Sequence, residues 1–246
     1  MKSLMTHLVA GYPDLVTSKQ TLKSMIDLQI VAIELQIPFS DPIADGPVLM
    51  QANDIAISNN IGISEVFDLI NSDFGDTKIY LMSYLQPIMN FGIDKFFKKA
   101  KALNVSGYII PDLPFDAPEL EQILKLDSGL SESIVPVLSQ GMPDDRLELL
   151  FKTLKPELVY VTARHGITGD KTASFDSSLE QFVAKVRSQT SASIALGFGI
   201  QTPDDVMKAN KLADIPVVGS AITRKMEKPN EVHKLLEDLA AVARIV

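Results

Sequence analysis

One feature constrains the fold of this chain more than any other: short apolar or β-branched runs alternate with longer stretches in which apolar residues recur at helical spacing, and they do so eight times. This alternation is typical of repeated βα units built around a parallel sheet. We expect strands at residues 4–10, 31–35, 78–84, 107–112, 133–139, 158–163, 193–199 and 216–222.

The number and length of the units favour a closed sheet. Eight units in 246 residues predict a (β/α)8 TIM barrel, an α/β fold formed by a single domain over residues 1–246. An open doubly wound sheet would show the same alternation but usually has fewer strands. We expect helices at residues 18–28, 49–71, 93–103, 143–154, 179–188 and 230–243, and others beginning near Pro118 and Pro203.

Composition excludes several classes of function. The chain has no cysteine, which rules out disulfides, zinc–thiolate sites and a cysteine nucleophile. A net charge of −8 argues against nucleic acid as a partner. No apolar run is long enough to cross a membrane and no signal peptide is evident, so we expect a cytoplasmic protein. The three histidines do not have the spacing of metal ligands, and no phosphate-loop or dinucleotide motif supports nucleotide binding.

In a barrel of this kind the active site lies at the carboxyl ends of the strands. Polar and glycine-rich segments fall at these ends: Glu34, Asp112, residues 164–169, 197–199 and 219–220. Glycines on three strand ends allow backbone N–H groups to approach an anionic oxygen, so we expect a phosphate site there, with a short extra helix at residues 223–226. The alternative is that these glycines merely terminate strands.

Glu34 and Asp45 form a carboxylate pair separated by eleven residues, one in a strand and one in the loop that follows it. A carboxylate flanked by Ile33 and Leu35 in a parallel strand is buried, and burial is costly unless the group is paired or functional. An ion pair inside the barrel is the alternative for Glu34. Asp41 and Asp45 lie in a proline-rich loop, where aspartate is also an ordinary turn residue.

The same segment carries a family resemblance. Residues 33–47, IELQIPFSDPIADGP, resemble the signature of the alpha subunit of tryptophan synthase. Further matching segments extend over almost the whole chain: LVAGYPD, LMSYLQP, IIPDLP, TARHGITG, LGFGI and VVGSAI. The resemblance implies a lyase that cleaves indole-3-glycerol phosphate to indole and glyceraldehyde 3-phosphate by a retro-aldol reaction, without a cofactor, in tryptophan biosynthesis.

The resemblance also implies residue roles. Glu34 would transfer protons, and Asp45 would hold the indole N–H. Thr168 would close over the site and pair with the aspartate of the loop after the second strand, and Phe198 would stack on the indole. The remaining residues expected to bind substrate are Tyr84 and Tyr160, with Gly169, Gly199, Gly219 and Ser220 at the phosphate.

A partner is implied as well: a beta subunit that carries pyridoxal phosphate, in an αββα heterotetramer through which indole passes. Asp41, Pro42 and Gln86 match the surface that contacts it. Two other functions stay open, a stand-alone lyase or other phosphate-binding barrel, and a mainly regulatory or channelling subunit with weak chemistry.

Several positions depart from the family pattern. Gln36 replaces a glycine, Gln86 an asparagine, His7 a tyrosine or phenylalanine in the indole pocket, and Val9 a threonine. Ile215–Pro216 replaces a dipeptide that begins with glycine. The first predicted strand starts at residue 4, so we expect the N-terminal helix that caps the barrel in the family to be missing. Gln36 is the departure closest to the chemistry, because it follows the strand that carries Glu34.

Overall fold

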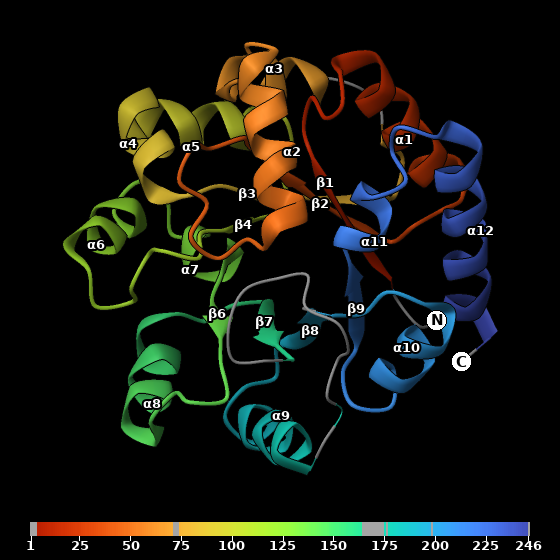
Figure 1. The fold of residues 1–246 in the computed structure, drawn as a ribbon. Helices are drawn as coiled ribbons and strands as arrows, with labels where there is room; N and C mark the ends of the chain where they lie inside the picture. Colours follow the sequence, from red (N-terminus) through yellow and green to blue (C-terminus); the bar gives the residue numbers. More distant parts are fainter. Residues whose placement is uncertain (1–3, 71–73, 164–174, 176, 198, 246) are drawn as a thin grey trace.

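The structure is a computed structural model that describes residues 4–70, 74–163, 175, 177–197 and 199–245. Parallel strands surround a central axis, and helices form the outer layer (Figure 1). The strands are β1 (Met5–Val9), β2 (Ala32–Gln36), β3 (Lys78–Met82), β4 (Gly107–Ile109), β5 (Ile134–Val135), β6 (Val137–Leu138), β7 (Leu158–Thr162), β8 (Ser193–Gly197) and β9 (Ile215–Val218).

The strand order is β5-β4-β3-β2-β1-β9-β8-β7-β6, and every pair is parallel. β5 and β6 together occupy the fifth predicted strand. Pro136 divides it because proline has no N–H to donate to a ladder. The first half pairs with β4 and the second with β7, so this one segment closes the sheet. The predicted single-domain (β/α)8 barrel is confirmed.

Helices cover the outside of the barrel. They are α1 (Leu15–Asp27), α2 (Pro47–Ser58), α3 (Ile63–Leu69), α4 (Leu85–Phe91), α5 (Ile93–Ala102), α6 (Pro118–Leu124), α7 (Leu130–Ser133), α8 (Asp144–Thr153), α9 (Ser177–Gln189), α10 (Pro203–Ala209), α11 (Ser220–Thr223) and α12 (Pro229–Ile245).

Several of the predicted boundaries were wrong. The helix expected at residues 49–71 is two helices, because α2 ends before Asn60, whose φ of 60° is incompatible with a right-handed helix, and α3 begins after Gly62. The last strand ends at Val218 rather than residue 222. The short helix after it is α11 at Ser220–Thr223 rather than residues 223–226, so Ser220 is helical.

Two apolar layers hold the barrel together. The larger lies between the strands and the helices, and includes the fully buried Leu8, Ile33 and Leu81. The smaller fills the barrel interior, where Met5, Tyr80 and Tyr160 belong to one cluster of inward-facing side chains.

Candidate active site

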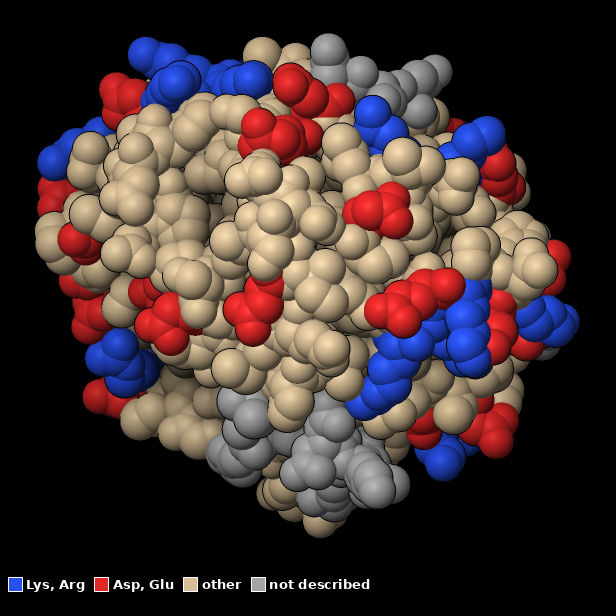
Figure 2. Space-filling model, turned by 45° about the horizontal axis from the view of Figure 1, so that its top comes forward, with Lys and Arg blue, Asp and Glu red and all other residues tan. Residues whose placement is uncertain are grey.

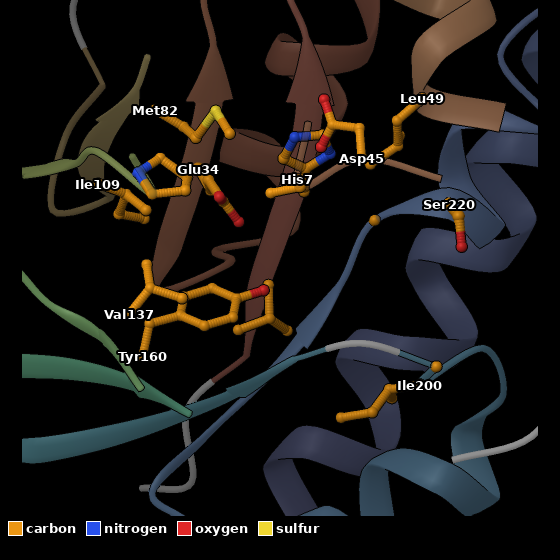
Figure 3. Close-up of a pocket in the computed structure, with 15 residues that line it drawn as sticks. His7, Glu34, Asp45, Leu49, Met82, Ile109, Val137, Tyr160, Ile200 and Ser220 are labelled. Atoms are coloured by element: carbon orange, nitrogen blue, oxygen red, sulfur yellow. The ribbon is translucent and has the colours of Figure 1, made fainter. Parts of the chain in front are cut away.

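A pocket opens at the carboxyl ends of the strands, where the barrel fold places active sites. In Figure 3, His7, Glu34 and Asp45 lie on one side of it, and Tyr160 and Ile200 lie on the other. The remaining lining residues are Ala44, Leu49, Met82, Ile109, Pro111, Val137, Gly199, Val217, Gly219 and Ser220. The pocket therefore brings together two predicted carboxylates and three of the predicted phosphate residues.

Glu34 is placed by β2, where it pairs in register with His7 of β1 and Tyr80 of β3. Its side chain is 6% exposed and reaches into the pocket (Figure 3). Burial, reinforced by the negative charge of Asp45, raises the pKa of Glu34 to about 8. Glu34 is consequently protonated at neutral pH and can donate a proton.

Asp45 lies in the loop between β2 and α2 and is also buried. Burial raises the pKa of Asp45 to about 6, while hydrogen bonds from Gln36, Asn53 and Tyr84 favour the carboxylate and limit the rise. Asp45 is therefore mainly ionised at neutral pH, where Glu34 is protonated. Two carboxyl groups with separated pKa values are the usual basis of an acid/base assignment.

Two amides fix the Asp45 carboxylate. Gln36 Nε2 donates to Asp45 Oδ2 at 2.6 Å, and Asn53 Nδ2 donates to the same oxygen at 3.2 Å. Asn53 is held in turn by Leu49 O, and its Oδ1 accepts from Phe39 N at 3.0 Å. These hydrogen bonds orient the Asp45 carboxylate, although it lies in a loop and not in a strand.

Gln36 also contacts His7, because Gln36 Oε1 lies 2.8 Å from His7 Nε2. Burial lowers the pKa of His7 to about 4, against the opposing effect of this hydrogen bond, so the ring is neutral at pH 7. The two departures from the family pattern in this region therefore contact each other. The Gln36 side chain thereby joins β1 to the Asp45 loop.

Tyr160 faces the carboxylates from β7, and burial raises the pKa of its hydroxyl well above its usual value. Gly197 on β8 leaves room for it: a Cβ at Gly197 would lie within 1.9 Å of Tyr160 Oη. Tyr84 comes from the segment after β3, and Ala44 N donates to its Oη at 3.0 Å. Tyr84 consequently ties the Asp45 loop to the start of α4.

The described residues that were predicted to bind phosphate follow β8 and β9 and form the anion end of the pocket. Gly199 follows β8 with a φ of 96°, and Gly219 caps α11, whose first residue is Ser220. The N–H groups in the first turn of a helix have no partner within it and favour an anion. Thr168, Gly169 and Phe198 lie outside the described residues.

The residues predicted to meet a partner lie outside the pocket. Asp41 and Gln86 are exposed, whereas Pro42 is buried against its own chain. Asp112 is structural here, since its Oδ1 accepts from Leu85 N at 2.8 Å at the start of α4. Among the described residues, no group of side chains could hold a metal ion, and no described helix is long and apolar enough to cross a membrane.

Sequence reasoning missed Asn53 and the apolar lining from Met82, Ile109 and Val137. Met82 and Ile109 could have been found from the alternation of inward and outward side chains along each strand. Asn53 had a weaker signal: a polar residue on the same face of α2 as the buried Leu49, Ala52 and Ala56.

The fold and the pocket define this protein as a (β/α)8-barrel enzyme with a buried acid/base carboxylate pair beside a glycine-rich anion site. The sequence model of the tryptophan synthase alpha chain family matches residues 1–245. The chain belongs to that family.

Individual relatives agree. The tryptophan synthase alpha chain of Thermotoga petrophila is 34% identical over 230 residues, which cover 93% of this chain and 92% of that one. The structure of the tryptophan synthase alpha subunit from Campylobacter jejuni matches with a TM-score of 0.85 at 32% identity, covering 97% of this chain and 95% of that one. A Mycobacterium tuberculosis tryptophan synthase structure shares the fold at 23% identity, with a TM-score of 0.87 and coverage of 100% and 93%.

Proposed function

We propose that Glu34 and Asp45 carry out the alpha reaction of tryptophan synthase, the retro-aldol cleavage of indole-3-glycerol phosphate to indole and glyceraldehyde 3-phosphate. Membership of the alpha chain family supports this reaction and the class of carbon–carbon lyase. The observation that carries the assignment of residues is the pair of pocket carboxyl groups whose pKa values are about 8 and about 6.

Glu34 supplies the proton that the reaction needs first. Carbon 3 of the indole ring must be protonated before its bond to the side chain can break, and a carboxyl group that is neutral at pH 7 can do this. The resulting Glu34 carboxylate then takes the proton of the side-chain hydroxyl that becomes the aldehyde. As the bond between carbon 3 of the ring and the side chain breaks, its electron pair returns to the ring. Glu34 is protonated again at the end of the cycle.

Asp45 stabilises the charge that forms in between. Protonation of the ring carbon places positive charge on the indole nitrogen, and an ionised, oriented carboxylate in a buried site stabilises such charge strongly. Gln36 and Asn53 both bond to Oδ2. The other oxygen, Oδ1, is free of both amides and would accept the indole N–H.

The rest of the pocket suits the remaining parts of the substrate. Tyr160, Met82 and Ile109 offer an apolar wall to the ring, and Gly199, Gly219 and Ser220 offer backbone N–H groups to the phosphate. Tyr84, which was predicted to bind substrate, is fully buried behind the lining and supports the Asp45 loop instead. Gly169 would add a further contact to the phosphate, Phe198 would stack on the ring, and Thr168 would close the site against water, as the family pattern implies.

Glu34→Gln tests this assignment. The amide cannot exchange a proton as the carboxyl group does, so indole release should fall by at least about 1,000-fold. Binding of inorganic phosphate or of a phosphate-bearing product should stay near the wild-type level. Asp112→Asn, in a carboxylate that bonds to Leu85 N outside the pocket, is the control. Retention of most of the indole release by Glu34→Gln would contradict the role of Glu34.

The alpha chain family implies a complex with a beta subunit. We propose the αββα arrangement, with pyridoxal phosphate confined to the beta subunit and none needed by this chain. Exposed apolar side chains near the Asp45 loop support a partner surface: Ile43 is 64% exposed, and Met89 on α4 is 49% exposed. Charged side chains are sparse over the middle of the face seen in Figure 2. A cytoplasmic location fits this role.

Gel filtration of this chain with its cognate beta subunit separates the complex from a stand-alone lyase. Co-elution at the mass of two alpha and two beta chains, weakened by Ile43→Asp, is the expected result. Separate elution together with full indole release would favour the stand-alone enzyme. Weak indole release that leaves the beta reaction activated would favour a mainly regulatory subunit.

A further inference from the structure

His7 has an unused polar atom at the wall of the pocket. The side chain is 5% exposed, and its Nε2 is engaged by Gln36 Oε1 at 2.8 Å. Its Nδ1 is buried and has no hydrogen-bond partner among the described residues. Leaving a buried polar atom unpaired costs free energy, so such an atom calls for an explanation, and at a pocket wall a ligand group is one.

The hydrogen bonds around Gln36 determine which His7 nitrogen carries the proton. The Asp45 carboxylate accepts only, so the Gln36 atom that faces it at 2.6 Å is the donor Nε2. The carbonyl oxygen Oε1 therefore faces His7 and must receive a hydrogen, which makes His7 Nε2 the protonated nitrogen. Because the ring is neutral, Nδ1 keeps a free lone pair and is a hydrogen-bond acceptor.

The position of this acceptor indicates which part of a ligand it would meet. A Cβ at Gly219 would lie 3.1 Å from His7 Nδ1, closer than side chains usually pack, so the glycine allows this edge of the ring to lie directly against the backbone of the anion end. Gly219 and Ser220 form the anion end of the pocket, and Glu34 is the register partner of His7 on β2. Nδ1 thus lies between the reacting carboxyl group and the anion end.

We infer that His7 Nδ1 accepts a hydrogen bond from a hydroxyl group on the carbon chain that links the ring of the substrate to its phosphate. Gln36 is a positioning residue that orients both His7 and Asp45. This inference rests on the proposed function and adds a determinant of specificity: the pocket distinguishes a hydroxylated chain from a plain alkyl chain.

A pair of matched ligands tests the inference. Indole-3-glycerol phosphate has hydroxyl groups on its chain, and indole-3-propyl phosphate has the ring and the phosphate without them. Binding is measured in the Glu34→Gln background, which prevents turnover, with ligand indole fluorescence as the signal because the chain contains no tryptophan. Adding His7→Phe should weaken binding of the hydroxylated ligand about three- to tenfold and leave the propyl analogue almost unchanged.

His233→Phe, on the exposed side of α12, is the matched control and should change neither affinity. If His7→Phe weakened the binding of both ligands equally, the ring would only shape the pocket. That result would overturn this inference but not the proposed function. Failure of Glu34→Gln to bind either ligand, with no indole release by the wild-type protein, would instead overturn the proposed function.

A second measurement works even if His7→Phe does not fold. Long-range 1H–15N spectra of the three histidines should show His7 protonated at Nε2 and bare at Nδ1. The Nδ1 resonance should move when the hydroxylated ligand is added and stay in place with the propyl analogue. A His7 protonated at Nδ1, or an equal response to both ligands, would contradict the inference.

Discussion

The two sides of the pocket are built from different chemistry. The side formed by β1, β2 and the Asp45 loop contains His7, Glu34, Gln36 and Asp45, all buried and polar. The side formed by β7 and β8 presents Tyr160, for which Gly197 makes room. Ionisable groups with strongly shifted pKa values thus concentrate on the first side, although the phenol of Tyr160 shifts as well.

The difference supports a division of roles that follows from the proposed function. We propose that the polar side, whose groups orient one another, carries out proton transfer and charge stabilisation. The opposite side, where the packing is close, would select the shape of the substrate. Changes on the first side should therefore lower kcat, and changes on the second side should raise KM and lower stability.

After Glu34→Gln, the largest effect is expected for Asp45→Asn. The variant keeps the shape of the side chain but loses the charge that stabilises the protonated ring, so kcat/KM for indole release should fall about 100- to 1,000-fold, mostly in kcat. Asp41→Asn, in the same loop but exposed, should behave like the wild type when the isolated chain is assayed. A change confined to KM would assign Asp45 to substrate binding and contradict the division of roles between the two sides of the pocket.

The pH dependence should give the next largest effect. Asp45 must be ionised, which requires a pH above its pKa of about 6, and Glu34 must be protonated, which requires a pH below about 8. The profile of kcat/KM should therefore be bell-shaped, falling about tenfold per pH unit below pH 6 and above pH 8. An activity that keeps rising above pH 8 would mean that Glu34 acts first as a base.

The smallest effect is expected for Gly197→Ala. The new methyl group would overlap Tyr160 Oη, and overpacking of a buried site costs about 1–3 kcal/mol. The Tm should fall by about 3–10 °C and KM should rise several-fold. The pH values at which kcat declines on either side of its maximum should stay the same. Ser193→Ala, at the exposed start of the same strand, is the control. A variant with a normal Tm and a reduced kcat would contradict the proposed difference between the two sides of the pocket.

The sequence was sufficient to predict the barrel because the alternation of strand and helix patterns depends only on local spacing. It was also sufficient for Glu34, since a carboxylate between two apolar strand residues stands out. Asn53 and the Gln36–Asp45 bond could not be predicted in the same way. Both depend on how the loop after β2 folds back, which no local pattern specifies.

Element boundaries failed where one residue changes the backbone. Pro136 interrupts a run that is otherwise a continuous strand, and Asn60 adopts a positive φ between two helices that look like one in the sequence. The end of β9 was overestimated because residues 219–222 are apolar or small and fit a strand as well as a helix. These errors reflect tertiary packing, which overrides weak local preference.

The interruption at Pro136 has a consequence for motion. β1, β2 and β3 pair along five residues, as do β7 and β8, whereas β5, β6 and β9 pair with their neighbours along only two. The barrel therefore contains two groups of strands with long pairings, β1–β3 and β7–β8, which are joined through the short pairings of β5, β6 and β9, and the pocket lies between the two groups. Opening of the barrel would break the fewest hydrogen bonds at these short pairings, so amide hydrogens there should exchange with solvent before those inside either group.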